Sequence, residues 1–134
     1  MLHLPSHAIA HLGGHASRKE LLTLGCDDTF IKLSLWYRSI LPTRRGWYAL
    51  PGTEQIVLRA LRAGGRLACV SALAWYEGRS IPEDEPVHIL VPYGASRLGA
   101  GAVVHWTRHV ITGSRLVVEP QRARRQAESC RARG

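Results

Sequence analysis

The segment Arg44–Pro51, which reads Arg-Arg-Gly-Trp-Tyr-Ala-Leu-Pro, constrains the fold of this chain more than any other stretch. Gly46 permits backbone angles that other residues resist, and Pro51 ends a strand because it has no amide proton to donate to a ladder. A basic pair, a glycine and an alternating aromatic run are typical of the return strand of a tight β-hairpin. We therefore predict a hairpin over residues 37–51, with residues 42–45 at its tip.

Start and stop signals predict the first two of three helices before this hairpin. Residues 5–12 carry a proline in the first turn and are followed by two glycines, which suits a short helix. Ser17 and Glu20 have the spacing of a capping box, in which each side chain accepts a hydrogen bond from the other residue's backbone amide. That box predicts a second helix over residues 17–24, which Gly25 ends.

A third helix is predicted to begin at Asp27 or Asp28, because acidic residues are favoured at the positive end of a helix dipole. The short turn before it is typical of a helix-turn-helix. We expect Phe30, Ile31, Leu35 and Ser34 to face inward, and Lys32 and Trp36 to face outward or to lie at the rim of the core. The order of helices and hairpin predicts a winged helix-turn-helix over residues 1–51, whose third helix enters the major groove of DNA and whose hairpin touches phosphate.

A small α/β portion is predicted for residues 53–134, so that the whole chain belongs to the α+β class. The expected elements are helices over 54–63 and 72–78, strands at 87–91, 103–106 and 116–118, and a basic C-terminal helix over 121–130. We expect the strands to form a short hairpin-like sheet and Ser71 to cap the second of these helices. A length of 134 residues fits one domain, or one small domain with a fragment.

The charge of the chain favours a nucleic-acid partner. Eighteen basic residues against ten acidic ones give a formal net charge of +8, and only Lys19 and Lys32 are lysines. Arginine suits phosphate because its planar fork donates two parallel hydrogen bonds, although a GC-rich genome also enriches arginine through codon bias. The sequence has no signal-peptide pattern and no apolar run long enough for a membrane span, so we expect a cytoplasmic protein without a membrane partner.

The candidate contacts to double-stranded DNA lie on the hairpin tip and on the second and third helices. Arg44 and Arg45 at the tip repel each other unless they meet anions, which favours phosphate contacts over a merely solvated turn. The other candidates for base or phosphate contacts are Lys32, Arg38, Thr29, Ser34 and Arg18. A second basic region, from Arg115 to Arg133, is either a solvated helix face or electrostatic support for DNA.

Large apolar residues around the third helix leave a second function open. The aromatic residues concerned are Trp36, Tyr37, Trp47 and Tyr48. They can form a stacking platform for single strands, but we expect them in the core, because a small domain needs large side chains to bury. Burial of Leu33, Leu35 and Trp36 favours DNA binding by the third helix. Their exposure favours a protein partner, such as a cognate toxin or a host factor.

Metal-binding and catalytic motifs are not visible in the sequence. Cys26, Cys69 and Cys130 are odd in number and far apart, so we expect neither a disulfide framework nor a zinc site, and we expect Cys69 to be buried. His105 is expected to pack beside Trp106 in a strand. The chain lacks the acid–lysine pattern of PD-(D/E)xK nucleases, a Ser/His/Asp order and a phosphate loop, so we expect no enzyme and no cofactor.

Two strings of residues carry a resemblance to a known family: Arg-Gly-Trp-Tyr-Ala-Leu-Pro at 45–51 and Gly-Arg-Leu-Ala-Cys-Val-Ser-Ala-Leu at 65–73. Together they resemble the winged-helix N-terminal region of AbiEi-type antitoxins of type IV toxin–antitoxin systems. The same region heads actinobacterial proteins that continue into a Vsr-like endonuclease domain. The resemblance extends to Val104-His105-Trp106 and implies a DNA-binding, antitoxin-like transcriptional regulator.

The chain departs from this family in two ways. The family's third helix is usually rich in arginine, whereas residues 27–36 are acidic at the start and apolar afterwards. This difference weakens the expectation of ordinary major-groove binding. The C-terminal domain of the family also has no counterpart in these residues, so the antitoxin or nuclease activity of that domain is not expected here.

Overall fold

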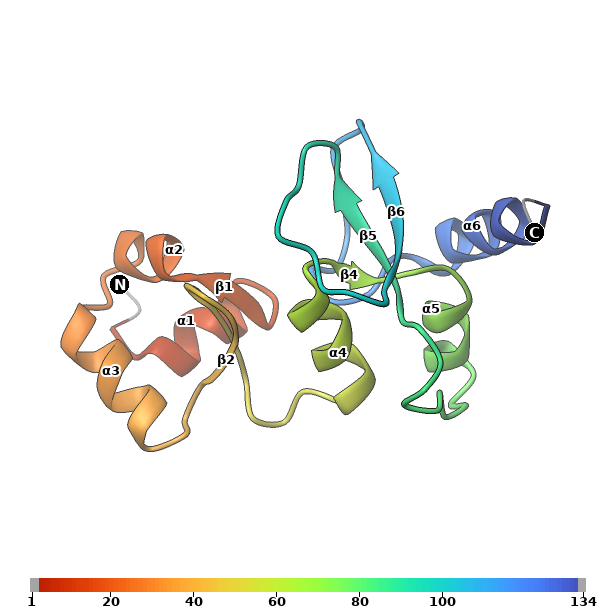
Figure 1. The fold of residues 1–134 in the computed structure, drawn as a ribbon. Coiled ribbons are helices and arrows are strands. Elements are labelled where there is room, and N and C mark those ends of the chain that lie inside the picture. The colour runs from red at the N-terminus through yellow and green to blue at the C-terminus, as the bar shows by residue number, and fades with distance from the viewer. Residues whose placement is uncertain (1–2, 133–134) are drawn as a thin grey trace. The chain divides into compact units, whose positions relative to one another are not determined.

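The computed structural model describes residues 3–132, and the chain divides into two compact units, Met1–Glu54 (the N-terminal unit) and Gln55–Gly134 (the C-terminal unit). The described residues form six α-helices and two three-stranded sheets, so the predicted α+β class is confirmed (Figure 1). The N-terminal unit contains α1 (Pro5–His11), β1 (His15–Ser17), α2 (Arg18–Thr23), α3 (Asp28–Trp36), β2 (Leu41–Arg44) and β3 (Trp47–Ala49). The C-terminal unit contains α4 (Gln55–Ala63), β4 (Arg66–Leu67), α5 (Cys69–Tyr76), β5 (His88–Pro92), β6 (Val103–Thr107) and α6 (Pro120–Ala132).

The helices of the N-terminal unit begin where the local signals predict. At the start of α2 the Glu20 amide donates to the Ser17 hydroxyl over 3.1 Å, and the Ser17 amide donates to the Glu20 carboxylate over 3.0 Å. At the start of α3 the Asp27 carboxylate accepts the amide of Phe30 at 2.8 Å. These side chains satisfy amides that have no partner within the first turn of a helix, which is why the sequence alone locates them.

The hairpin is shorter than predicted. Arg44 at the end of β2 lies opposite Trp47 at the start of β3, so the turn holds only Arg45 and Gly46. Residues 37–40, predicted as the first part of the outward strand, instead form the turn that follows α3. β3 is the central strand, because β1, which was not predicted, pairs with its other side. β2 is therefore an edge strand, as its proline predicts.

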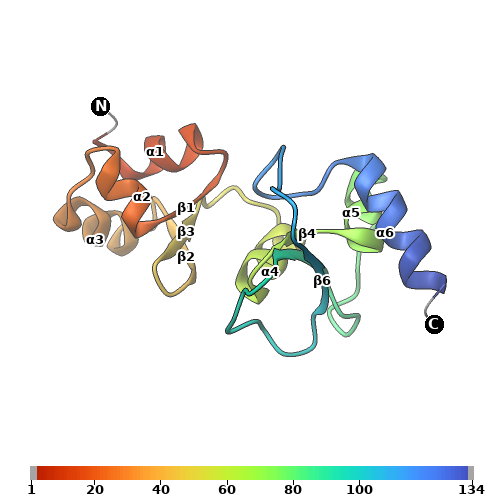
Figure 2. The same ribbon diagram turned by 90° about the horizontal axis from the view of Figure 1, so that it is seen from above.

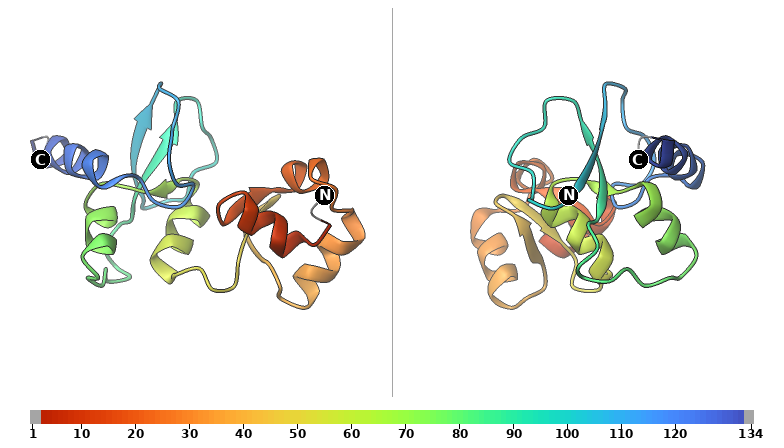
Figure 3. Two further views of the ribbon diagram at one scale, coloured as in Figure 1. Left: turned by 180° about the vertical axis from the view of Figure 1, so that it is seen from behind. Right: turned by 45° about the vertical axis from the view of Figure 1, so that its right-hand side comes forward.

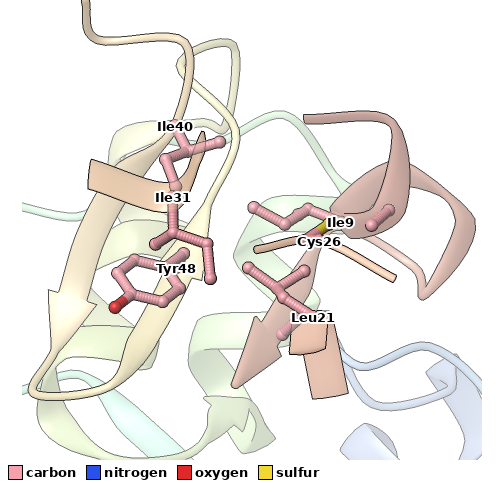
Figure 4. Packing of buried hydrophobic residues seen from close by; sticks show 8 residues of the cluster. Ile9, Leu21, Cys26, Ile31, Ile40 and Tyr48 are labelled. Atoms are coloured by element: carbon pink, nitrogen blue, oxygen red, sulfur yellow. The ribbon is translucent and has the colours of Figure 1, made fainter. Parts of the chain in front are cut away.

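The core of the N-terminal unit lies between the three helices and the sheet. Figure 4 shows its buried side chains, among them Ile9, Leu21, Cys26, Ile31, Ile40 and Tyr48. Tyr48 is only 7% exposed, whereas Trp47 is 38% exposed and stacks on the His15 ring with 5.0 Å between centroids. Successive residues of a strand point to opposite faces, so only one of this pair faces the core. The expectation of buried aromatics is correct for Tyr48 and wrong for Trp36, Tyr37 and Trp47, which are exposed, while the outward placement of Trp36 on the third helix is correct.

The sheet of the C-terminal unit is not hairpin-like. β5 and β6 run parallel and side by side (Figure 3), and β4 pairs antiparallel with the other side of β5. Residues 93–102 carry the chain back to the start of β6, so they do not form a hairpin turn. The strand predicted at 116–118 is reduced to one bridge between Leu67 and Val117. An added Cβ on Gly65 would lie 2.6 Å from the Leu90 carbonyl oxygen, so the approach of the chain to β5 requires glycine there.

Helices α5 and α6 pack against each other in this unit (Figure 2). Ala123 and Ala127 are buried and lie four residues apart, on one side of α6. α5 begins at Cys69 and not after Ser71, so the prediction that Ser71 caps this helix is wrong. Ser71 lies within the helix, and its buried hydroxyl accepts the amide of His88 at 2.9 Å.

Candidate functional site

The tip of the β2–β3 hairpin is a two-residue turn of Arg45 and Gly46. Gly46 has a φ of +78°, in the region where side chains other than glycine are strained. Arg45 is exposed, and Arg44 is half-buried at the end of β2. The turn thus presents an arginine to solvent at the tip, while the second arginine lies one position before it in the strand.

The hairpin tip lies beside the start of α2. The backbone amide of Arg18 donates to the carbonyl of Gly46 over 2.8 Å, and Ser17 pairs with Trp47 across β1 and β3. This contact brings Arg18, the first residue of α2, close to the turn that carries Arg45. The fold therefore gathers basic residues that are distant in the sequence.

One carboxylate binds two of the predicted DNA contacts. The Arg18 guanidinium donates to Asp28 through Nε at 3.1 Å and Nη2 at 2.9 Å, and Lys32 Nζ lies 3.1 Å from the other Asp28 oxygen. The hydrogen bond from Arg18, followed by that from Lys32, holds the pKa of Asp28 below its usual range. Exposed ion pairs of this kind contribute little to stability, but the carboxylate offsets positive charge where DNA contacts were predicted.

Arg38, Thr29 and Ser34 do not share one surface with the hairpin tip. Arg38 follows α3 with a φ of +59°, and hydrogen bonds from its amide to Leu35 and from the Ser39 amide to the Ser34 carbonyl close the helix. This is a Schellman end, a position that glycine usually takes. Thr29 is exposed in the first turn of α3, whereas Ser34 is half-buried and lies about 140° away around the helix.

The outward face of α3 is apolar. Phe30 is 46% exposed, Leu33 is 45% exposed and Trp36 is 82% exposed, and their spacing of three residues places them along one side of the helix. Phe30 was expected to face inward, which is wrong, because Ile31 and Leu35 fill the inward side. The burial of Leu33, Leu35 and Trp36 was expected to distinguish DNA binding from protein binding. Leu33 and Trp36 are exposed, and Leu35 packs on the core.

Most of the net charge belongs to the C-terminal unit. Residues 1–54 hold six basic and four acidic residues, a net +2, and residues 55–134 hold twelve basic and six acidic residues, a net +6. The exposed arginines of α6 are Arg124, Arg125 and Arg131. The overall charge of +8 is therefore weaker evidence for DNA binding by the N-terminal unit than the sequence total implies.

A cluster of four potential metal ligands lies in the C-terminal unit. Cys69, His88, His105 and Cys130 each offer one ligand atom, and these atoms lie within 4.8 Å of one another. They come from α5, β5, β6 and α6, in that order. His88 Nδ1 and His105 Nε2 lie 3.2 Å apart, and the planes of the two rings are tilted by 33°.

Burial shapes the chemistry of this cluster. Burial, together with the neighbouring Cys130, raises the pKa of the Cys69 thiol to about 11. Burial also lowers the pKa of His88, which favours its neutral imidazole. Removal from water disfavours the charged form of each group.

The sequence interpretation did not find this cluster. Cys69 is buried as expected, but it is not an isolated small side chain, and His105 lies against His88 as well as beside Trp106. Successive ligands are at least 17 positions apart in the sequence, so no local spacing motif identifies them. The signal that remained was the presence of two cysteines and two histidines in elements predicted to share one small fold.

Comparisons with known proteins find no match for this chain among protein-family models or curated proteins. Within residues 3–132, no helix combines the length and the apolar character that a membrane crossing requires.

Proposed function

We propose that the N-terminal unit is a winged helix that binds duplex DNA and contacts phosphates through the tip of its hairpin, as an antitoxin-like transcriptional regulator does. The observation that carries this proposal is a hairpin, β2–β3, that follows three helices and pairs with β1 in an antiparallel sheet, with an arginine turn hydrogen-bonded to the start of α2. In winged helices the hairpin is the wing that touches the DNA backbone. The resemblance of residues 45–51 to the AbiEi-type region supports the same proposal.

The proposed contact is to the DNA backbone more than to base edges. Major-groove reading needs polar side chains that match the donors and acceptors of the bases. The exposed side of α3 offers mainly Phe30, Leu33 and Trp36, and Lys32 is paired with Asp28. Phosphate contacts position a protein without carrying sequence information, so binding of this kind discriminates weakly among sequences.

Replacing both wing arginines, as Arg44→Ala with Arg45→Ala, is expected to weaken duplex binding about 10- to 150-fold, because the loss of a hydrogen bond to a charged group costs about 1.5–3 kcal/mol. The loss should be similar for all sequences, and the melting temperature should change little because the tip is a surface turn. Fluorescence anisotropy with labelled mixed-sequence duplexes at low salt measures the affinity.

A charge-matched control separates the wing from the overall charge. Arg124→Ala with Arg125→Ala removes the same two charges from the exposed side of α6. We expect this variant to lose clearly less affinity than the wing variant. Equal losses from the two pairs would contradict the wing as the contact and would indicate attraction by net charge alone.

A second candidate function is protein binding through α3, and the apolar exposed side of that helix favours it. Contiguous exposed apolar side chains on a small protein commonly mark a protein interaction site. Phe30, Leu33 and Trp36 form such a row, and the neighbouring ion pairs of Asp28 give it a polar edge. A cognate toxin or a host factor is the kind of partner that this function requires.

Lys32→Ala distinguishes the two roles of α3. Since Asp28 already holds Lys32, we expect the base preference selected from a randomised duplex library to be unchanged. Relaxed preference at one base pair, costing about 1–3 kcal/mol, would show instead that α3 reads bases. Trp36→Glu should leave the melting temperature unchanged, because this side chain is 82% exposed, and should abolish binding of a protein partner that uses α3.

A further inference from the structure

We propose that Cys69, His88, His105 and Cys130 bind one zinc ion in a closed structural site of the C-terminal unit. The proposal rests on the placement of four ligand atoms within 4.8 Å of one another by four different elements. It does not depend on the proposed DNA binding, which belongs to the N-terminal unit.

The geometry is close to that of tetrahedral zinc. Zinc binds thiolate sulfur at about 2.3 Å and imidazole nitrogen at about 2.0–2.1 Å, so a tetrahedral site sets two nitrogen ligands about 3.4 Å apart and two sulfur ligands about 3.8 Å apart. His88 Nδ1 and His105 Nε2 lie 3.2 Å apart, and all the pairs of ligand atoms lie within 4.8 Å. Small side-chain movements are therefore sufficient to bring the four atoms around one ion.

The sheet places the two histidines on one face. In the parallel register of β5 and β6, His88 pairs with Val103 and His105 pairs with Leu90. His88 and Leu90 are two residues apart in one strand and point to the same face, which His105 shares as the register partner of Leu90. The imidazoles are thus diagonal neighbours, a spacing that long side chains bridge.

The two helices supply the cysteines and hold the ligand backbone. Cys69 opens α5 with a φ of +54°, a strained backbone of the kind that concentrates at ligand sites. Its amide donates to the Gln126 side chain of α6 over 3.0 Å. Gln126 and Cys130 are four residues apart and lie on one side of α6. The amide of His88 is likewise held, by the hydroxyl of Ser71 in α5.

The donor set fits zinc and a structural role. Two thiolates and two imidazoles form one of the ligand sets of structural zinc sites, in which all four positions are taken by protein side chains. No position is then left for water or substrate, so the ion would hold α5 and α6 to the sheet and would not act on a substrate. A unit of eighty residues has only a small hydrophobic core to stabilise it, so a structural metal ion would add stability that the core alone does not supply.

The direct test titrates the reduced, metal-free full chain with Zn²⁺ alone and with Co²⁺ alone. We expect one ion per chain in each titration. The Co²⁺ complex should show the visible bands of tetrahedral cobalt and a near-ultraviolet thiolate-to-cobalt band with the intensity of two thiolates. A folded, reduced chain that binds no stoichiometric zinc overturns the proposal, and so does a cobalt spectrum without thiolate bands.

Ligand variants and a matched cysteine control locate the site. Cys130→Ser and His105→Ala should each weaken zinc binding by more than about 100-fold, since even hydrogen-bond partners of metal ligands contribute about 10- to 100-fold. Cys26→Ala removes the third cysteine, which is buried in the N-terminal unit, and should bind zinc like the parent chain. Loss of binding in the Cys26 variant with retention in Cys130→Ser would overturn the assignment. The cobalt spectrum of the parent chain tests the site even where a variant fails to fold.

The chemical alternative for these cysteines is a disulfide between Cys69 and Cys130, which is not formed in the structure. Mass spectrometry of the chain before and after reduction distinguishes the two states. A Cys69–Cys130 disulfide in the purified chain, combined with no zinc uptake after reduction, would assign the pair to redox chemistry and overturn the zinc proposal. Zinc uptake by the reduced chain supports it, because ligand thiolates must be free to bind.

Discussion

Tyr48→Ala is expected to destabilise the N-terminal unit by about 3–5 kcal/mol, the usual cost of truncating a buried aromatic side chain. Tyr48 is 7% exposed on the central strand of the sheet and packs among Ile31, Leu21 and Ile40 (Figure 4). The truncation removes its contacts and leaves a cavity that the three short helices cannot close. Urea unfolding of the full chain, with residue-resolved hydrogen exchange of the amides of residues 5–49, measures the loss.

The neighbouring residue provides the matched control. Trp47→Ala removes a larger side chain from the same strand, but this tryptophan is 38% exposed on the other face and mainly stacks on His15. We expect a cost of about 1 kcal/mol, near the centre of the range for point substitutions. A reversed order, with Trp47→Ala unfolding the unit and Tyr48→Ala tolerated, would mean that β3 presents its other face to the core.

The helix starts could be predicted because they depend on chemistry within four residues. Ser17, Glu20 and Asp27 satisfy amides of their own first turns, so their geometry needs no distant partner. β1 was missed for the opposite reason. Residues 15–17 become a strand only because β3 pairs with them, and a three-residue segment after two glycines carries no period of its own.

The side-chain faces were predicted less well than the elements. α3 is apolar at most of its positions, so the helical period cannot tell which apolar residue faces the core. Packing decided that Ile31 and Leu35 turn inward and that Phe30 stays out. Likewise, the alternating residues of β5 and β6 predicted strands, but alternation is the same in parallel and antiparallel pairs, so the direction of β6 was not predictable.

The candidate sites differ in how far the sequence could indicate them. Arg45 and Gly46 are adjacent, and their place in a turn follows from residue type alone. The contact of that turn with Arg18, and the pairing of Arg18 and Lys32 with one carboxylate, form only when the fold brings the start of α2 next to the hairpin and to the start of α3. The zinc ligands are the extreme case, because four elements of the C-terminal unit must be assembled before any two of them meet.

Salt dependence is the measurement with the largest expected change for the proposed DNA binding. Each phosphate that the protein neutralises releases counterions, so the slope of log K against log salt is about −0.9 for every such contact. For two to four contacts near the wing, affinity for duplex DNA should fall about 10- to 150-fold between about 50 and 200 mM salt. The small net charge of the N-terminal unit is the reason to expect a slope in this lower range.

The wing variant should change that slope as well as the affinity. If Arg44 and Arg45 each neutralise one phosphate, their replacement by alanine makes the slope about 2 less negative, whereas replacement of the paired Lys32 leaves the slope unchanged. Binding through the apolar side of α3 has the contrary signature, since burial of Leu33 and Trp36 by a protein partner releases few counterions. Absence of duplex binding even at low salt would contradict the proposal that this unit binds DNA. If, in addition, the chain bound a protein partner in a way that salt does not affect and that Trp36→Glu abolishes, the functional surface of this unit would be α3.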